Sequence, residues 1–589
     1  MYEAGQLLVL NLDSDKHGPS TPLWISRLFA TTALLFLGIE VVLQVGGRGI
    51  DRFRLLYRKH VAPHFHEDGK RVLVIGSGEG AAAFACSLVA LDWRTGQHTN
   101  LRKREGLRNR VVTHMSVGTQ RVTGFPSDSG PVLSITRPIL TPLCLREIGV
   151  ANYTDVVIIE PDDSKSLETL ATLQAAAAEL HMSGPTRARP TTRICIRSPE
   201  VGANFRRATW AAKPSGGPVR IWCPDDLSAR RALQTVDLDE VCSFAEPGGH
   251  STVVLIGFGE ANRVLAARAI SQIHHVDETR LQIHVFDHQA AHCWSLFQQA
   301  WLGVAQAVYH TLHEVDAHGS GVFDWLREQV REQSTNLLIA VSVGDVDANL
   351  ALATAILDAL EAEADNPKAV MMIRKSGVAD STAIASFVCA DSASSIQVLV
   401  WGDAHSSQAS DDFLEEEVDR LAMAVHAEYL KGEQAREPVT WQMRLQDATK
   451  DPYSSLKDWS ELSRFLRDDN RNCVEFAHRR LSALGLRLVD EVQPGQSEIK
   501  AQDLSEDELT TLARLEHRRL IVNRLMNGWK LGGKKDWERR THPDLVPWEK
   551  LPRQAQLKDR RVMLEYEGER IKQMMGSGTR LVRFVAGID

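Results

Sequence analysis

Two glycine-containing turns hold the residues whose spacing most plainly predicts chemistry. The chain reads RVLVIGSGEG over residues 71–80 and TVVLIGFGE over residues 252–260, so an apolar run leads into Gly-x-Gly-Glu each time. In such a turn the first glycine permits a tight strand-to-helix connection, the second lets the backbone approach a diphosphate, and the third position must be small. The amino-terminal end of the following helix favours the anion. The three positions are Gly76, Gly78 and Ala81 in the first copy and Gly257, Gly259 and Asn262 in the second.

An acidic residue near the second turn indicates a nucleotide site there. The run LQIHVFDHQ predicts the next strand, and Asp287 stands at its end, where a carboxylate can bind a ribose. Glu260 completes the Gly-x-Gly-Glu motif, whereas the matching run of the first copy, RVVTHMSVG, ends without an acid. We therefore predict that the second copy binds NAD(H) or a related adenine nucleotide and that the first copy is degenerate. In the alternative interpretation both turns serve only tight packing.

A second set of candidate binding residues lies between residues 512 and 551. Two tryptophans there can stack on a planar ring, and four cations can pair with phosphate or carboxylate. These residues are Trp529, Trp548, Arg518, Arg519, Lys534 and Lys535. They predict a nucleotide-like or phosphorylated ligand, unless the tryptophans fill a small helical core and the cations face solvent. Glu516 beside His517 invites acid–base chemistry, but adjacent helical residues point to different faces.

Other patterns typical of catalysis or metal binding are missing from the sequence. It contains no recognisable nucleophile–base set, its eight cysteines include no CxxC pair, and its histidines include no HExxH. We therefore predict neither a metal site nor a disulfide framework, and a sensor rather than an enzyme. The net charge of -8 argues against nucleic acid as a partner, because phosphate binding favours a basic face.

The elements that must position these residues occur twice in the chain. DVVIIEPDDSKSLETLATL from Asp155 corresponds to NLLIAVSVGDVDANLALATAIL from Asn336, and RICIRS from Arg193 corresponds to MMIRKS from Met371. With the glycine turns, these correspondences lie about 180 residues apart, which predicts two copies of one fold. Strands that alternate with helices indicate parallel sheets. The predicted fold class is therefore α/β, with two tandem Rossmann-like, doubly wound parallel-sheet domains.

The two copies resemble the NAD-binding domains of TrkA-type and RCK-type regulators of potassium channels and transporters. The resemblance covers residues 68 to 400 and rests on the turn glycines, on CLREIGVANYTDVVIIEPDD from Cys144, and on Asp345, Asp347 and Asn349. It adds Asp347 and Asn349 to the predicted cofactor-binding residues. It also implies a homo-oligomer and coupling to a channel or transporter subunit.

The segment from 512 to 551 resembles the ryanodine-receptor (RyR) repeat domain. The matching positions are Glu516, His517, Gly528, Trp529, Lys534, Lys535, His542, Pro543, Leu545, Val546, Pro547, Trp548 and Leu551. The resemblance implies a mainly α-helical module whose ligand would contact Glu516, His517, Arg518, Trp529, Lys534, Lys535, His542, Pro547 and Trp548. The runs LAMAVHAEYL and LARLEHRRLI look like one element used twice, which predicts a diverged repeat before the intact one.

An apolar segment from Leu23 to Val45 predicts one transmembrane helix. Its only ionisable residues are Arg27 and Glu40, and its length suffices to span a bilayer. Basic residues follow the segment, so the positive-inside rule places the C-terminal bulk in the cytoplasm. The family resemblance implies that the membrane is a bacterial inner membrane. The alternative is a buried amphipathic helix of a soluble protein.

These features predict a membrane-associated, nucleotide-sensing regulator of potassium-type ion transport, with the RyR-like module as a second ligand-binding or interaction unit. One alternative is a nucleotide-activated effector that damages the membrane in a defence pathway. Another is an NAD-dependent oxidoreductase, although no acid–base residue for the nicotinamide is identifiable. The predicted parts are an anchor with a basic linker at 1–67, sheet domains at 68–245 and 246–405, a diverged repeat at 406–488, a linker at 489–507 and the RyR-like module at 508–589.

Overall fold

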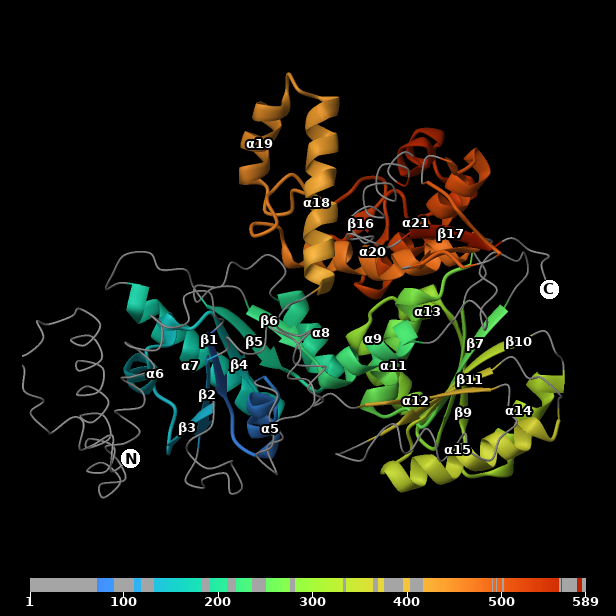
Figure 1. The fold of residues 1–589 in the computed structure, drawn as a ribbon, viewed down its shortest axis with the longest axis horizontal. Coiled ribbons are helices and arrows are strands. Elements are labelled where there is room, and N and C mark those ends of the chain that lie inside the picture. Colours follow the sequence, from blue (N-terminus) through green and yellow to red (C-terminus); the bar gives the residue numbers. More distant parts are fainter. Residues whose placement is uncertain are drawn as a thin grey trace, which may run out of the picture. The chain divides into compact units, whose positions relative to one another are not determined.

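The fold is given by a computed structural model that is divided into two compact units (Figure 1). One unit is Met1–Val157 with Ala171–Thr191, and the other is Ile158–Leu170 with Thr192–Asp589. The residues that the structure describes are 71–88, 111–117, 132–181, 190–208, 219–235, 250–275, 281–331, 335–363, 369–375, 396–402, 417–489, 491–493, 495–500, 503–560, 563 and 580–584.

The first sheet has six strands in the order β3-β2-β1-β4-β5-β6. The strands are β1 (Arg71–Ile75), β2 (Val111–Val117), β3 (Val132–Arg137), β4 (Asp155–Ile158), β5 (Thr191–Cys195) and β6 (Val219–Trp222). The helices between them are α5 (Glu79–Ser87), α6 (Pro142–Ile148), η3 (Val150–Asn152), α7 (Asp163–His181), α8 (Pro199–Ala208) and α9 (Pro224–Thr235). Strand β2 runs parallel to both β1 and β3, and β5 runs parallel to β6.

The second sheet repeats this topology, with the order β12-β11-β10-β7-β8-β9 and parallel pairing throughout. Its strands are β7 (His250–Ile256), β8 (Gln282–Asp287), β9 (Tyr309–Glu314), β10 (Thr335–Val341), β11 (Ala369–Arg374) and β12 (Gln397–Trp401). Its helices are α11 (Glu260–Gln272), α12 (Ala290–Ala300), α13 (Val304–Ala307), α14 (Ser320–Arg331) and α15 (Val346–Glu361). Numbered within its own sheet, each order reads 3-2-1-4-5-6, which confirms the predicted pair of Rossmann-like sheets.

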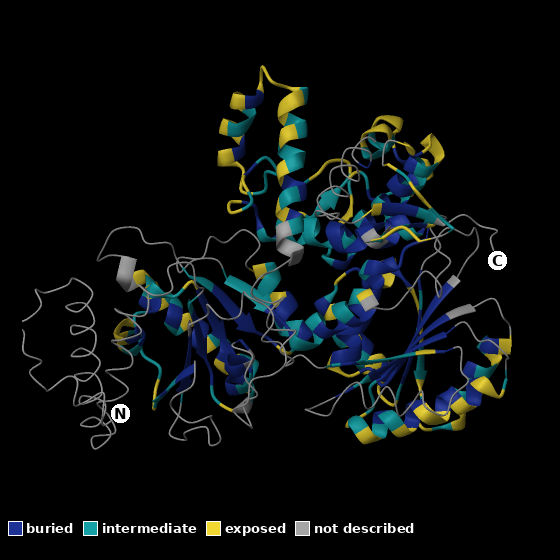
Figure 2. Ribbon diagram, viewed as in Figure 1, coloured by how far each residue is buried: buried dark blue, intermediate teal, exposed yellow. Residues whose placement is uncertain are grey.

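Strand β7 shows why its sequence is apolar without interruption. Val253 and Leu255 point to the face that α11 and α12 cover, whereas Val254 and Ile256 point to the face that α14 and α15 cover. Successive residues of a strand alternate between faces, so a strand that is covered on both sides needs apolar residues at every position. Figure 2 shows the strands of the second sheet buried, with exposed residues along α14 and α15.

The C-terminal region is mainly helical. It contains α18 (Glu417–Arg436), α19 (Trp441–Lys450), α20 (Arg464–Ser482), β13 (Leu486–Val489), β14 (Gln496–Glu498), α21 (Glu506–Met526), β15 (Lys530–Leu531), β16 (Thr541–His542), η5 (Trp548–Lys550) and β17 (Arg580–Phe584). The long helix α21 begins at a capping box, in which Ser505 accepts a hydrogen bond from the backbone N–H of Glu508 and Glu508 accepts one from that of Ser505.

The second sheet and the C-terminal helices share one hydrophobic core. Phe476 of α20 and Leu515, Val522 and Met526 of α21 belong to the same buried cluster as Val253 of β7. The close approach has a local marker at Gly303, where an added Cβ would lie 2.2 Å from the carbonyl oxygen of Leu525. The cores of these two regions are therefore continuous.

The predicted transmembrane segment from Leu23 to Val45 lies outside the described residues. Among the helices that are described, none combines the length and the apolar character that a bilayer crossing requires.

Candidate functional site

The second glycine turn connects β7 to α11 at the point where the strand order of the sheet reverses. Gly257 has a φ of 76°, a conformation that favours glycine, and its N–H donates to the carbonyl of Phe286 at 2.8 Å. A Cβ on Gly257 would lie only 2.3 Å from the carbonyl oxygen of Ser342. The first glycine is therefore required both by its backbone angle and by the contact with the end of β10.

Gly259 has the opposite surroundings. Its φ of -65° suits any residue, and a Cβ added there would meet nothing within 4 Å. Gly259 is also exposed and forms the N-cap of α11. The backbone of this turn is therefore open to an incoming group at the end of the helix where unpaired N–H groups favour an anion.

Asp287 closes the turn from the neighbouring strand. One carboxylate oxygen accepts a hydrogen bond from the N–H of Phe258 at 2.7 Å, and the other accepts from the N–H of Gln289 at 2.8 Å. The side chain is only 11% exposed. Because a carboxylate offers about four lone pairs, these two bonds leave acceptor capacity for a hydroxyl group. The predicted ribose-binding residue thus lies beside the glycine turn.

The third position of the motif is occupied by a buried amide instead of a small residue. The side-chain nitrogen of Asn262 donates to the carbonyls of Gly257 at 2.6 Å and of Ile256 and Ala340 at 3.3 Å each. Asn262 therefore fastens the turn to the ends of β7 and β10. Its length, which makes it unusual for the motif, is what lets it reach all three carbonyls.

The charges around this turn are mostly negative. Burial raises the pKa of Glu260, the neighbouring carboxylates of Glu200, Asp163 and Asp225 raise it further, and Arg263 partly offsets these effects. Arg263 itself pairs with Glu200 at 2.9 Å. The site therefore disfavours ligands that carry many negative charges at this point.

The first glycine turn differs from the second in the residues that support it. The N–H of Gly76 donates to the carbonyl of Met115, so Ser116 stands where Asp287 stands in the second sheet. His114 occupies the interior instead, where its Nε2 contacts the carbonyl oxygen of Gly76 at 3.2 Å. The turn is nevertheless open at Gly78, which has a φ of 100° and nothing within 4 Å of an added Cβ. Ala81 is buried.

The two residues that the RCK resemblance added fall at the start of α15. Asn349 is buried and binds backbone groups on both sides: its oxygen accepts from Val343 at 2.7 Å, and its nitrogen donates to Arg374 at 3.0 Å. It fastens the β10–α15 connection to the end of β11, as Asn262 fastens the glycine turn. Asp347 is exposed on the first turn of α15.

Glu516 and His517, which are adjacent in the RyR-like segment, have different partners in the structure. Glu516 belongs to an ion network and pairs with Arg480 and Arg519, whereas His517 binds the carbonyl of Val546 at 2.8 Å. The two neighbours therefore point to different partners.

Trp548 packs in one hydrophobic cluster and Trp529 in another, so the structure does not bring them together. Arg518 contacts the carbonyl of Ala307 at 3.5 Å, and Lys534 and Pro547 are exposed.

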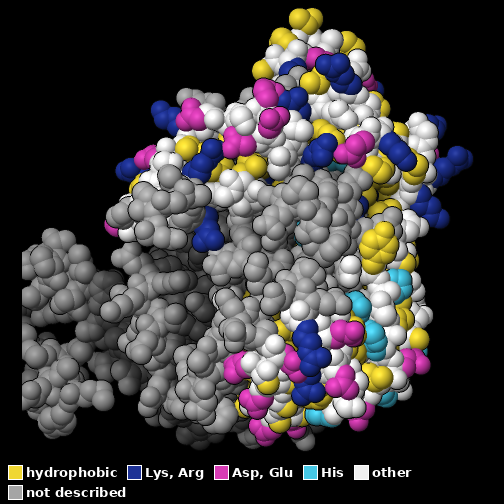
Figure 3. All heavy atoms as spheres, turned by 90° about the vertical axis from the view of Figure 1, so that its right-hand side faces the viewer, with side chains coloured by type: hydrophobic (Ala, Val, Ile, Leu, Met, Phe, Trp, Pro, Cys, Tyr) yellow, Lys and Arg dark blue, Asp and Glu magenta, His cyan; other side chains and the backbone are white. Residues whose placement is uncertain are grey.

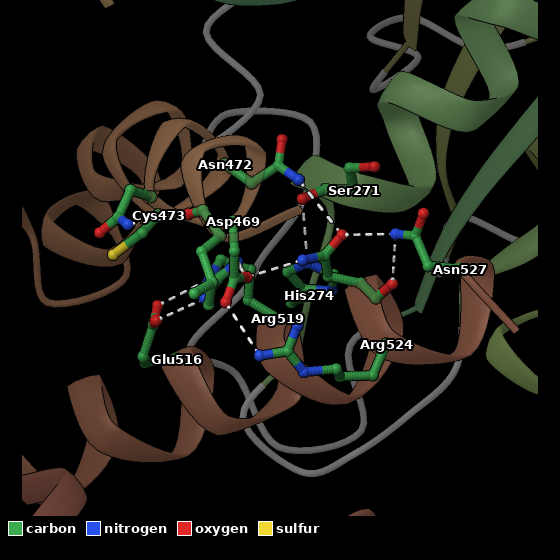
Figure 4. Close-up of polar contacts among 12 residues, drawn as sticks. Ser271, His274, Asp469, Asn472, Cys473, Glu516, Arg519, Arg524 and Asn527 are labelled. Atoms are coloured by element: carbon green, nitrogen blue, oxygen red, sulfur yellow. Dashed lines mark hydrogen bonds and ion pairs between the residues drawn. The ribbon is translucent and has the colours of Figure 1, made fainter. Parts of the chain in front are cut away.

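Figure 4 shows the ion network between α20 and α21, next to Ser271 and His274 at the end of α11. Asp469 accepts from Arg519 and Arg524 at 3.1 Å each and from Asn523 at 2.7 Å. The two arginines hold the pKa of Asp469 at about 2, against the opposing effect of burial. The network therefore fastens the two helices together.

Around Trp529 the structure gathers residues that the sequence did not single out. The Arg524 guanidinium carbon lies 4.4 Å from the ring centre of Phe465, 5.2 Å from that of Trp529 and 6.0 Å from that of Trp537. Lys535 and His542, both predicted from the RyR resemblance, border the same aromatic cluster. Phe465 lies on α20, so no local pattern around Trp529 could have predicted its contribution.

Histidines and acidic residues form no metal centre in the described part of the chain, where no group of three or more potential ligands occurs. Figure 3 shows histidine side chains gathered on one face. Among the described residues, His284 Nδ1 and His313 Nε2 lie 3.1 Å apart and form a hydrogen bond.

Comparison with known proteins leaves the chain without an assigned family. No family model matches it, and no curated protein is significantly similar. The RCK-like and RyR-like identities stay predictions from the sequence.

Proposed function

We propose that this protein is a nucleotide-responsive regulator that binds an adenine nucleotide or dinucleotide at the second glycine turn. The proposal depends chiefly on Asp287, a largely buried carboxylate that orders the turn and retains acceptor capacity next to the open Gly259. A ribose hydroxyl donating to Asp287 and a phosphate at the start of α11 would use both features.

The acidic surroundings refine the expected ligand. Glu200, Asp163 and Asp225 lie close enough to Glu260 to raise its pKa, and Arg263 is already paired with Glu200. Each additional phosphate group therefore meets repulsion. We expect NAD or ADP-ribose to bind more tightly than ATP, because their diphosphate carries less negative charge than a triphosphate.

Helix α11 offers a physical route from this site to the C-terminal region. The helix begins at the turn, and its Arg268 pairs with Asp226 on α9 and, at 3.1 Å, with Glu475 on α20. A ligand that displaces the start of α11 would shift these ion pairs, provided that it binds two arrangements with different affinities. In our proposal the output is regulation of ion transport by a homo-oligomer at the membrane, a step supported by the sequence resemblance and the apolar segment at 23–45.

Calorimetric titration of the full chain with NAD, NADH, ADP-ribose and ATP tests the binding step. The critical variant is Gly259→Val, because a Cβ added there meets no atom within 4 Å and the branched side chain would occupy the space that a phosphate needs. Gly321→Val is the matched control, since Gly321 on α14 also has nothing within 4 Å. Binding that is lost in the first variant and kept in the second supports the site. Equal affinity in both variants, or no binding of any nucleotide to the wild type, would refute it.

A further inference from the structure

The aromatic cluster of the C-terminal region surrounds a buried cation. Arg524 lies near the carboxyl end of α21 with its side chain only 5% exposed, enclosed by the rings of Phe465, Trp529 and Trp537. Its Nη2 pairs with Asp469 at 3.1 Å, and Asp469 also serves Arg519. One carboxylate is thus divided between two guanidinium groups.

Several hydrogen-bond donors at this cluster have no acceptor among the described residues. Nε and Nη1 of Arg524 and the indole nitrogen of Trp529 are buried without a partner. Trp529 is only 1% exposed. Buried donors without acceptors are costly, and the cost is greater when the donor is charged. These atoms therefore call for an acceptor that the described side chains do not supply.

Two further polar groups stand at the border of the cluster. The Lys535 ammonium lies 4.8 Å from the ring centre of Trp537, and the backbone N–H of Asp544 donates to Nδ1 of His542 at 3.1 Å. In neutral His542 the hydrogen is therefore on Nε2, which makes that atom a donor. Lys535 is exposed as a whole, but desolvation of its ammonium by the neighbouring residues and repulsion from Arg524 lower its pKa to about 8. Burial and repulsion from Arg524 lower the pKa of His542 to about 4, so that His542 is neutral near pH 7. Two positive groups, Arg524 and Lys535, thus repel each other here, and an anion would relieve their repulsion.

The faces of Trp537 are already in use. Tyr453 stacks on its ring at 4.9 Å with an interplanar angle of 8°, Lys535 lies over it, and Phe465 and Trp529 meet it in T-shaped contacts. A flat ligand could not stack there without displacing a side chain. The unmet requirement is therefore for oxygen acceptors and negative charge, rather than for an aromatic ring.

We propose that Arg524, Trp529, Lys535 and His542 form a binding site for a compact oxyanion of the phosphate type. This site is distinct from the glycine turn and does not depend on the nucleotide proposal. Lys535 is exposed and Trp537 half-buried, so this side of the cluster reaches solvent, whereas Arg524 and Trp529 are buried. The oxyanion is either free phosphate or the phosphoryl group of a small phosphomonoester, and both offer the same acceptor atoms.

The adjacent lysines provide a matched test by calorimetry on the full chain. Lys535→Met removes a cation over Trp537, whereas Lys534→Met removes the same charge from an exposed neighbour. We expect inorganic phosphate and sulfate to bind, with about tenfold weaker affinity in Lys535→Met and a change of less than about twofold in Lys534→Met. Equal losses in the two variants would mean that only general charge attraction operates, which would overturn the proposal.

Three further arms complete the test. Arg524→Gln should abolish sulfate binding; if that variant fails to fold, the lysine pair still decides. Sulfate keeps its charge between pH 6 and 9, so its affinity should fall as Lys535 loses its proton near pH 8. Comparing phosphate with ribose 5-phosphate and glycerol phosphate separates the two sources, since tighter binding of an ester indicates a phosphoryl group on a larger ligand. Absence of binding by every anion would show that water satisfies these donors, and the site would be rejected.

Discussion

Arg268 and Glu475 form an ion pair across 207 residues of sequence, with Nη1 of Arg268 3.1 Å from the carboxylate of Glu475. Glu475 is only 2% exposed in this pair and also contacts Arg230 at 2.9 Å. Because Arg268 belongs to the helix that starts at the glycine turn, this buried contact joins the proposed nucleotide site to α20. Helix α11, rather than a loop, is therefore the physical connection between the second sheet and the C-terminal helices.

Replacing Glu475 tests how much this connection stabilises the molecule. Glu475→Gln removes the buried charge with which both Arg230 and Arg268 pair, and we expect a loss of about 3 kcal/mol in the free energy of unfolding. Denaturant-induced unfolding, followed by tryptophan fluorescence, measures it. Asp447→Asn, which disrupts an exposed pair with Lys450 on α19, should cause no measurable change. Equal stability of the two variants would contradict the role of the buried pair.

Substitution by alanine should destabilise the protein at Gly257 but not at Gly259. Gly257→Ala introduces a Cβ 2.3 Å from the Ser342 oxygen at a φ of 76°, whereas Gly259→Ala meets no atom at a φ of -65°. We therefore expect Gly257→Ala to reduce stability by more than about 2 kcal/mol, with Gly259→Ala close to the wild type. Thermal unfolding compares them. A stable Gly257→Ala protein would mean that the turn adopts another conformation.

Replacing Asn262 by alanine should destabilise the protein less than replacing it by aspartate. Asn262→Ala removes donors to three carbonyls and should cost about 2 kcal/mol. Asn262→Asp places acceptor oxygens against those same carbonyls, in a position that is fully buried, and should be clearly worse. Chemical unfolding of both variants gives the order. If aspartate proved as good as asparagine, the side chain would not face the carbonyls.

Acidification should weaken the first sheet through His114. Burial lowers the pKa of His114 to about 4, from its ordinary value of 6.5. The unfolded chain therefore takes up a proton that the folded chain excludes, so this contribution to stability falls as the pH drops from about 6.5 to 4. The slope is about 1.4 kcal/mol for each pH unit. Unfolding at pH 7, 6 and 5 should show a smaller slope for His114→Gln, with the exposed His318→Gln as control. An unchanged slope would mean that His114 does not titrate in this range.

The sequence predicted the repeated α/β sheets because alternation, apolar strands and turn glycines are local signals. It also marked Asp287 correctly as a residue beside the second turn, since a strand end has a defined place in this topology. The roles of Asn262 and Asn349 were harder to predict from the sequence. Their role is to bind carbonyl groups at the ends of other strands, and such contacts depend on which strands become neighbours.

The C-terminal site shows the same limit more strongly. Trp529 and Trp537 lie in the conspicuous segment, but Phe465, which packs on Trp529, and Tyr453, which stacks on Trp537, come from earlier parts of the chain. Residue types alone could not distinguish Trp529, which borders unpaired donors, from Trp548, which packs against His517 at a ring distance of 5.8 Å. Burial of Arg524 likewise depends on rings from two separate segments.

The shared core of the second sheet and the C-terminal helices also bears on how this chain could have been assembled by recombination. A module that is exchanged freely between proteins carries its own closed interior, whereas here Phe476, Leu515 and Met526 lie in the same interior as β7. A gene fragment encoding either part alone would yield a product with an exposed apolar surface, which promotes aggregation. These two regions therefore have to be kept together when either is moved into another protein.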